Sequence, residues 1–267
     1  MLLRHPREAQ DGLEPEDAFE AIEEHTGEKL GSCRIIVEDN AVLYPTRPYS
    51  VRLDLEGEDG LEALLGAALA RARTKCLVSG KACRIYTGCA PDNAELLSLL
   101  NSYGFRDNDG LVRMAKHLPS HSAPRLPAGC VIVRDDLSDS IERKYFIERY
   151  NQLFQTQDGE NWLREKSALR GFTRFLSVAP TGLAGEIVLW CEPLVGVIGY
   201  IQTSRRWRRI GVARYMLSVA EGYFSEEGLY AVQADVRVRI PGLLATLEDS
   251  GYHQDKLLMR YPGIEVP

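Results

Sequence analysis

The chain has 267 residues, of which 45% are hydrophobic and 26% charged, as expected for a globular protein of one large or two ordinary domains. No apolar run suits a signal peptide or a membrane span, so we expect a cytoplasmic protein with no membrane partner. Residues 1–118 hold 14 Lys and Arg against 20 Asp and Glu, whereas residues 119–267 hold 18 of each. Since duplex-binding domains usually carry a basic face, nucleic acid is not an expected partner.

The first half is predicted to contain one weak helix around Ala18, Phe19 and Ile22, followed mainly by strands. A second helix is predicted over residues 90–105, ending at Gly104, because glycine suits a left-handed helix C-cap. The predicted strands cover residues 33–39, 41–46, 49–57, 81–88 and 110–118. Residues 117–129 contain three prolines and little apolar periodicity, and they are predicted to be a linker.

The second half is predicted to begin with a strand over residues 129–137 and two helices over 138–154 and 159–170. Three further strands follow over residues 173–180, 185–193 and 194–203, and the first two suggest a hairpin. After a helix that starts near Gly211, the remaining elements are a strand, a helix and a strand over residues 229–239, 241–252 and 256–261.

The two halves end in the same order of elements. Each closes with a strand, a helix that stops at a Gly-aromatic pair, and a final strand. The pairs, Gly104-Phe105 and Gly251-Tyr252, are 147 residues apart. We interpret this as an internal repeat of domain size.

The six cysteines show no C-x-x-C pair and no histidine at metal-ligand spacing. We therefore expect no metal site and no disulfide framework, but reduced and mostly buried thiols. They are Cys33, Cys76, Cys83, Cys89, Cys130 and Cys191.

The most informative stretch is RRWRRIGVARYML, residues 205–217. It follows an apolar strand and leads, after Gly211, into apolar positions at helical spacing. Free N–H groups at a helix start bind anions, small residues let a phosphate approach the main chain, and arginines add bidentate charge. The stretch predicts a pyrophosphate site; a solvated basic loop is the alternative, and a nucleic-acid contact is a further one.

Residues 208–213, RRIGVA, match the R/Q-x-x-G-x-G/A signature of the GNAT acyltransferases, and the chain resembles that family. Trp207, the preceding strand with Gly199-Tyr200-Ile201, and the downstream Gly-aromatic unit are similar to it as well. The resemblance implies that acetyl-CoA or another acyl-CoA is the co-substrate, with its pyrophosphate on this turn and its pantetheine beside the strand. The implied binding residues are Ile201, Gln202, Thr203, Arg208, Arg209, Ile210, Gly211, Val212, Ala213 and Arg214.

Together with the internal repeat, the resemblance implies a tandem protein of the α/β (α+β) class. Each GNAT-like repeat is expected to be a mixed, mostly antiparallel sheet flanked by helices. We expect a degenerate repeat over 1–118, a linker over 119–128, and an acyl-CoA-binding and catalytic domain over 129–267. The implied function is N-acyl transfer to a small amine or amino acid derivative, by a monomer or homodimer. The alternative is a non-catalytic acyl-CoA-binding module.

The catalytic residues are harder to assign. Many family members carry a proton-donating tyrosine where this chain has Leu247, and an asparagine where it has Ile240. The candidate substitutes are Tyr200, Asp235 and Tyr252, each of which has a structural alternative as a packed aromatic ring or a solvated carboxylate. Glu192 is a further candidate base, although a Glu-Pro pair often simply marks a turn.

The corresponding turn of the first half is acidic. It carries Glu56, Glu58, Asp59 and Glu62 where a phosphate would need neutral or basic groups. Like charges at a desolvated contact cost several kcal/mol. We therefore expect the first half to bind no coenzyme A.

Overall fold

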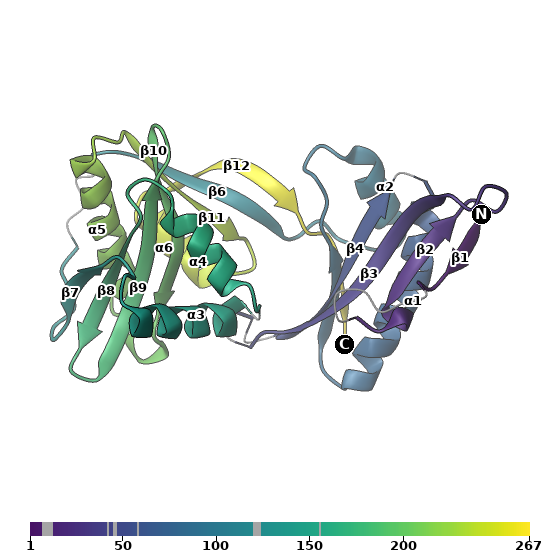
Figure 1. Cartoon of the computed structure of the whole chain (residues 1–267), viewed down its shortest axis with the longest axis horizontal. Coiled ribbons are helices and arrows are strands. Elements are labelled where there is room, and N and C mark those ends of the chain that lie inside the picture. Colours follow the sequence, from purple (N-terminus) through teal and green to yellow (C-terminus); the bar gives the residue numbers. More distant parts are fainter. Residues whose placement is uncertain (7–12, 42, 45–46, 58, 120–123, 155) are drawn as a thin grey trace. The chain divides into compact units, whose positions relative to one another are not determined.

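The structure is a computed structural model, and it describes residues 1–6, 13–41, 43–44, 47–57, 59–119, 124–154 and 156–267. The chain forms two compact units (Figure 1). Unit 1 comprises Met1–Leu111 and Leu258–Pro267, and unit 2 comprises Val112–Leu257. In the described part of the chain, no helix combines the length and the apolar character needed to cross a membrane.

Unit 1 is built on a six-stranded sheet in the order β1-β2-β3-β4-β5-β13. Its neighbouring strands are antiparallel except for β4 and β5, which are parallel because α1 returns the chain between them. The strands are β1 Leu2–Arg4, β2 Ala18–Ile22, β3 Lys29–Asp39, β4 Tyr49–Gly57, β5 Cys83–Thr87 and β13 Gly263–Val266. The helices are α1 Leu61–Ser79 and α2 Ala94–Ser102, and a 3-10 turn covers Pro15–Asp17.

The core of unit 1 lies between its sheet and the apolar faces of α1 and α2. Leu64, Leu65 and Ala68 of α1 are fully buried against residues of β3 and β4 such as Ile35 and Leu53. α1 contacts β2, β3, β4 and β5. The helix therefore packs across most of the sheet.

Unit 2 is built on a seven-stranded sheet in the order β12-β6-β11-β10-β9-β8-β7, with β10 and β11 parallel. The strands are β6 Gly110–His117, β7 Val131–Asp135, β8 Thr173–Ala179, β9 Gly182–Cys191, β10 Val195–Thr203, β11 Ala231–Arg237 and β12 His253–Arg260. The helices are α3 Ser140–Phe154, α4 Gly159–Ser167, α5 Val212–Glu226 and α6 Pro241–Asp249.

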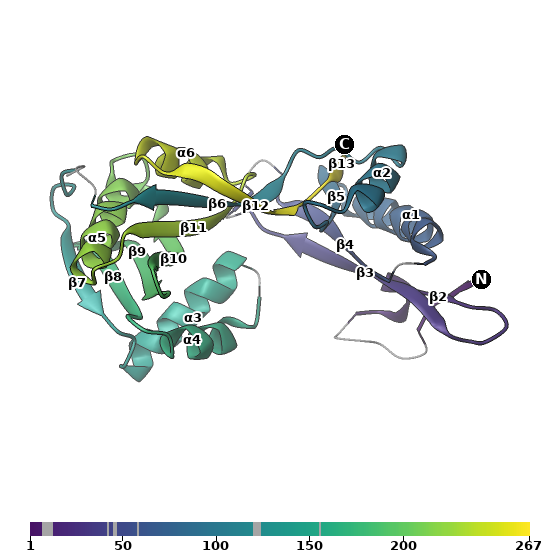
Figure 2. The ribbon, with the colours of Figure 1, turned by 90° about the horizontal axis from the view of Figure 1, so that it is seen from above.

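Helices cover both faces of this sheet, with α5 and α6 on one side and α3 and α4 on the other (Figure 2). Successive side chains of β9 point alternately to the two faces of the sheet. Ile187 and Leu189 belong to the core under α5, whereas Trp190 contacts Trp162 of α4. β9 is buried along almost its whole length, so both faces are packed.

The fold class is as predicted: two mixed, mostly antiparallel sheets flanked by helices. The unit boundaries differ from the predicted ranges 1–118 and 129–267. The prediction counted β6 with the first repeat, but β6 pairs between β11 and β12 in the sheet of unit 2. Similarly, β13 pairs with β5 in unit 1. The predicted linker lies partly outside the described residues.

Two local predictions in unit 1 were wrong. The weak helix around Ala18 is strand β2, because this segment pairs with both β1 and β3. The strand predicted over residues 41–46 does not form at residues 41, 43 and 44, which are the residues of this range that the structure describes. Asn40 accepts hydrogen bonds there from the backbone N–H groups of Leu43, at 3.0 Å, and Tyr44, at 3.0 Å, so the chain turns. Residues 42, 45 and 46 lie outside the described residues.

The prediction of reduced cysteines was also wrong at one place. Cys76 of α1 and Cys83 of β5 form a disulfide, with Cα atoms 5.8 Å apart. The turn after α1 reverses the chain at Gly80, which has φ 62°, and so brings the two cysteines together. The other four thiols are free and buried.

Candidate functional site

The turn from β10 into α5 leaves the start of the helix open. A 3-10 turn covers Arg205–Trp207, and Gly211 is the N-cap of α5, with φ 93° and no side-chain cap. A Cβ at Gly211 would meet no atom within 4 Å. The N–H groups of the first helical turn have no side-chain cap and lie at the positive end of the helix dipole.

The backbone of this turn is held in an unusual conformation. Arg209 has φ 64°, which costs a non-glycine residue about 1–2 kcal/mol. The guanidinium Nε of Arg208 donates to the carbonyl oxygen of Thr203 at 3.3 Å, and Trp207 packs against the core. Such strain persists where the surrounding structure enforces it, which is common at functional sites.

The arginines of the turn are exposed. Among the described residues, no carboxylate pairs with Arg205, Arg206, Arg208 or Arg209. Arg214, in contrast, pairs with Asp249 at 3.0 Å. The predicted anion site thus combines an uncapped helix start with four guanidinium groups that have no acidic partner.

The strand that leads to this turn separates from its parallel neighbour. β10 and β11 pair only up to Ile198 and Ala234, although both strands continue. A bulge interrupts the pairing of β10 with β9 at Gly199. The backbone of Tyr200–Thr203 therefore has no described strand partner on its β11 side. The predicted binding residues Ile201, Gln202 and Thr203 lie on this segment, which an extended ligand can pair with.

Tyr200 lies within an aromatic cluster between β10 and the helices α3 and α4. Its ring centroid is 5.5 Å from that of Phe146 and 6.0 Å from that of Tyr150. Trp162 of α4 stacks on Tyr150 at 4.7 Å. The Tyr200 hydroxyl donates to Glu186 Oε1 at 3.3 Å and contacts Gln202 Oε1.

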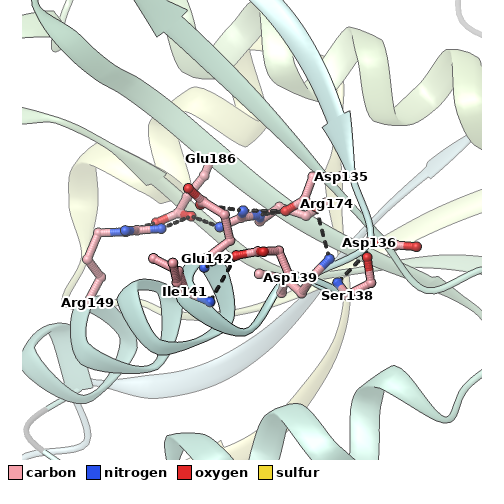
Figure 3. A network of polar contacts seen from close by, with 10 residues as sticks. Asp135, Asp136, Ser138, Asp139, Ile141, Glu142, Arg149, Arg174 and Glu186 are labelled. Atoms are coloured by element: carbon pink, nitrogen blue, oxygen red, sulfur yellow. Dashed lines mark hydrogen bonds and ion pairs between the residues drawn. The ribbon is translucent and has the colours of Figure 1, made fainter.

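Glu186 connects this cluster to a chain of charged side chains (Figure 3). It is fully buried and accepts two hydrogen bonds from Arg149, at 2.8 and 2.9 Å. Arg174, also fully buried, lies 3.5 Å from Glu186 and pairs with Asp135 and Glu142. Every buried charge in this network has an opposite partner, as burial requires.

The network fixes the protonation of its members. Burial, and next the Glu186 carboxylate, raise the pKa of Tyr200 far above its ordinary value. Burial lowers the pKa of Arg149, but its hydrogen bonds to Glu186 and the negative charges of Glu186 and Glu142 together more than offset this effect, and the pKa is raised overall. Tyr200 is therefore a neutral hydroxyl at any physiological pH.

Asp235 lies on β11 and is exposed, on the face of the sheet opposite to the core under α5. Its carboxylate accepts two hydrogen bonds from Arg113 of β6, at 2.8 and 3.0 Å. Glu192, the other candidate base, accepts a hydrogen bond from Gln233 at 3.4 Å. Both acids thus already have partners on neighbouring strands.

Tyr252 and Leu247 lie in the core under α5 and α6, so the structure does not bring Tyr252 together with Tyr200. Burial, and next the Glu221 carboxylate, raise the pKa of Tyr252 strongly. Lys116 lies 5.5 Å from its ring centroid and pairs with Glu221 at 2.9 Å. Tyr252 is therefore a packed ring, which was the structural alternative for this residue.

Sequence reasoning missed the residues that support the site. A Cβ at Gly185 of β9 would lie 2.9 Å from Val212 and 3.0 Å from Met216, so this glycine lets α5 pack closely on β9. Arg149, Arg174 and Glu186 were missed because their pairing joins elements far apart in sequence. The only available signal was a glutamate within the otherwise apolar run of β9.

The corresponding turn of unit 1 is closed. Gly60, the N-cap of α1, has φ 74°, like Gly211. A Cβ there would lie 2.9 Å from Ala21 and 2.9 Å from the sulfur of Met1, so side chains occupy the space that is open in unit 2. The acidic Glu62 follows in the first helical turn, and Glu58 lies outside the described residues.

Many solved structures are similar to this chain, and three of them are described here. A GCN5-related N-acetyltransferase from Sphaerobacter thermophilus is 16% identical, with a TM-score of 0.51, over 96% of this chain and 82% of its own. A probable N-acyltransferase from Enterococcus faecalis is 11% identical, with a TM-score of 0.53, over 93% of this chain and 62% of its own. A glucosamine N-acetyltransferase region of a fungal multi-domain GH3 β-N-acetylglucosaminidase is 14% identical, with a TM-score of 0.51, over 92% of this chain and 33% of its own.

These similarities extend over both units, so they confirm the predicted tandem GNAT fold. At these identities they establish the fold alone. No family model and no curated protein matched the sequence.

Proposed function

We propose that this protein, which has the tandem fold of GCN5-related N-acetyltransferases, transfers an acyl group from coenzyme A to an amine. Acetyl is the simplest such group, and the acceptor is a small amine or an amino acid derivative. The observation that carries the proposal is the open, uncapped start of α5, with exposed arginines beside it. Unit 2 performs the transfer.

In this proposal the pyrophosphate binds the N–H groups at the start of α5, with Arg208 and Arg209 beside it. Gly211 keeps the main chain accessible, because its neighbourhood is empty. The pantetheine lies along Tyr200–Thr203, where β10 has no described partner strand on its β11 side. The amide groups of pantetheine suit pairing with such a strand edge.

The chemistry joins the acceptor nitrogen to the thioester carbon and breaks the bond between carbon and sulfur. The amine must react in its neutral, deprotonated form. Its attack leaves the nitrogen with one proton more than the amide has, and this proton passes to solvent as the amide forms. An ordinary thiol has a pKa of about 8.5, so coenzyme A leaves readily as a thiolate and takes a proton from solvent. Positioning of the two substrates then supplies most of the rate enhancement.

Tyr200, Asp235 and Tyr252 have structural roles in this proposal. A tyrosine whose pKa is raised by burial is a weak proton donor to a thiolate. Asp235 is occupied by Arg113. Tyr200 instead packs in the aromatic cluster beside β10, where its hydroxyl donates to Glu186.

A second candidate function is acyl-CoA binding without transfer. Leu247, fully buried, stands where many acyltransferases of this fold carry a tyrosine. Such a module would bind the same ligand at the same turn. Only an assay of turnover separates the two functions.

The experiment has two stages. Acetyl-CoA at 100 times its dissociation constant stabilises its binder by about 2.7 kcal/mol, which we expect to raise the melting temperature by about 5–10 °C. Thiol release is then followed with a panel of small amines and amino acids. Stabilisation without thiol release from any acceptor favours the binding module, and stabilisation by oligonucleotide alone contradicts both functions.

A further inference from the structure

Unit 2 contains a cavity near the C-terminal end of α5, the opposite end from the turn with the exposed arginines. It has a volume of about 630 Å³. Its walls come from the end of β7, the start of α3, the segment between α4 and β8, and Tyr223 of α5. Cavities of this size hold small molecules. Nothing in the proposed acyl transfer uses it.

One wall of this cavity is cationic, and its main arginine is held in place. Arg134 lies 5.0 Å from the ring centroid of Tyr223 and 5.9 Å from that of Phe175. Its Nε donates to Thr173 Oγ1 at 3.1 Å. Stacking and this hydrogen bond fix the plane of the guanidinium, so little side-chain entropy remains to be lost when its Nη groups bind a ligand.

Arg134 and Arg143 are both exposed, so their guanidinium groups are accessible to a ligand from solvent. Among the described residues, no acceptor lies within hydrogen-bond distance of the Nη atoms of Arg134 or of the Arg143 guanidinium. The acids of the cavity already have partners. The Ser138 side chain, and next the Ser138 N–H that donates to Asp136 at 3.0 Å, lower the pKa of Asp136. Glu227 pairs with Arg170 at 3.6 Å.

Apolar side chains form another wall of the cavity. Leu169 and Phe172 line it together with Tyr223, whose hydroxyl donates to the carbonyl oxygen of Gly171 at 3.0 Å. If a planar anionic group bound Arg134 and Arg143, the rest of the ligand would contact this apolar wall. A bare inorganic ion would leave most of the cavity empty.

We propose that this cavity binds a small organic carboxylate with an apolar body, such as an aryl or branched-chain acid. The carboxylate pairs with the Nη groups of Arg134, with Arg143 as a second cation, and the apolar body lies against Leu169 and Phe172. Carboxylates match the fork of an arginine in a bidentate pair. The site is independent of the acyl-CoA turn.

Benzoate, benzamide and inorganic phosphate serve as probes, measured by calorimetry and ligand-observed NMR on the full chain at constant ionic strength. We expect saturable binding of benzoate. Benzamide, the neutral analogue, and phosphate, which lacks the apolar body, each bind at least about 10-fold more weakly. Equal binding of benzoate and benzamide, equal binding of phosphate, or no saturable binding at all would overturn the proposal.

Two variants and a control locate the site. Arg134→Met and Arg143→Met are each expected to weaken benzoate binding by about 10-fold or more, with an unchanged circular dichroism spectrum. Lys144→Met is the control. It removes a positive charge from α3, the helix that carries Arg143, but Lys144 does not line the cavity, and we expect binding to be unchanged. Gly211→Asp, which tests the acyl-CoA turn, also leaves benzoate binding unchanged. Loss of benzoate binding in Lys144→Met but not in Arg134→Met would contradict the assignment.

Discussion

The indole ring of Trp190 occupies the space where a side chain of residue 199 would begin. A Cβ at Gly199 would lie 1.8 Å from Cζ3 and 2.0 Å from Cη2 of Trp190. The glycine stands at the bulge of β10, immediately before the segment on which we propose that pantetheine binds. Close packing with Trp190, rather than a left-handed backbone, requires glycine here.

Gly199→Ala is therefore expected to destabilise unit 2 by about 1–3 kcal/mol, because it overpacks the ring, and to lower the melting temperature accordingly. Thermal unfolding by calorimetry measures the effect. Gly222→Ala in α5 is the matched control, since a Cβ there meets no atom within 4 Å, and we expect it to be neutral or stabilising. Trp190→Phe in the same chain should recover part of the loss; an additive double variant would show that the clash is not the cause.

The proposed binding of acyl-CoA at the turn before α5 leads to a graded prediction. Arg208→Ala and Arg209→Ala are each expected to weaken acetyl-CoA binding by about 1–3 kcal/mol, and Arg205→Ala and Arg206→Ala by less than about 1 kcal/mol. Gly211→Asp is expected to abolish binding, because it places a negative charge beside the pyrophosphate. Gly211→Ala separates charge from strain: it adds the same left-handed strain and no charge, so it retains measurable binding. Calorimetry provides the affinities, and four equivalent arginines with a silent Gly211→Asp would reduce the turn to a diffuse basic patch.

The two units are expected to differ in ligand binding, with one coenzyme A bound per chain. In unit 1, Ala21 and Met1 close the space beside Gly60, and Glu62 adds a negative charge to the first turn of α1. The stoichiometry from calorimetry tests this directly. A value near two would show that neither the acidic turn nor the closed helix start excludes the ligand.

Loss of any one candidate proton-transfer group is expected to have little effect on turnover. Tyr200→Phe, Asp235→Asn and Tyr252→Phe each remove the titratable group with little change of volume. We expect each to retain the rate constant kcat within about tenfold, whereas loss of a general acid or base typically costs 100-fold or more. Steady-state thiol release over a range of pH distinguishes the two outcomes. A loss above 100-fold in one variant, together with a changed pH profile, would identify that residue as the missing acid or base.

The sequence predicted the conformation of the turn between β10 and α5 because the signals for it are local. The step from strand to helix, the role of Gly211 and the exposed arginines all follow from a stretch of 13 residues. The buried network of Arg149, Arg174 and Glu186 joins α3, β8 and β9, so it depends on how those elements pack. Strand β2 and the unit boundaries escaped prediction for the same reason, because pairing with distant strands decided them.

Because β13 completes the sheet of unit 1, the sheet can be finished only late in the synthesis of the chain. Residues 263–266 pair with β5, and the buried Arg84 of β5 pairs with Glu265 at 2.9 Å. During synthesis, the first half of the chain cannot finish its own sheet until the last part of the second half has left the ribosome. Until then the pair between Arg84 and Glu265 cannot form, and β5 remains an open edge, which exposes the nascent chain to pairing with other strands. The half that is translated first is therefore completed last.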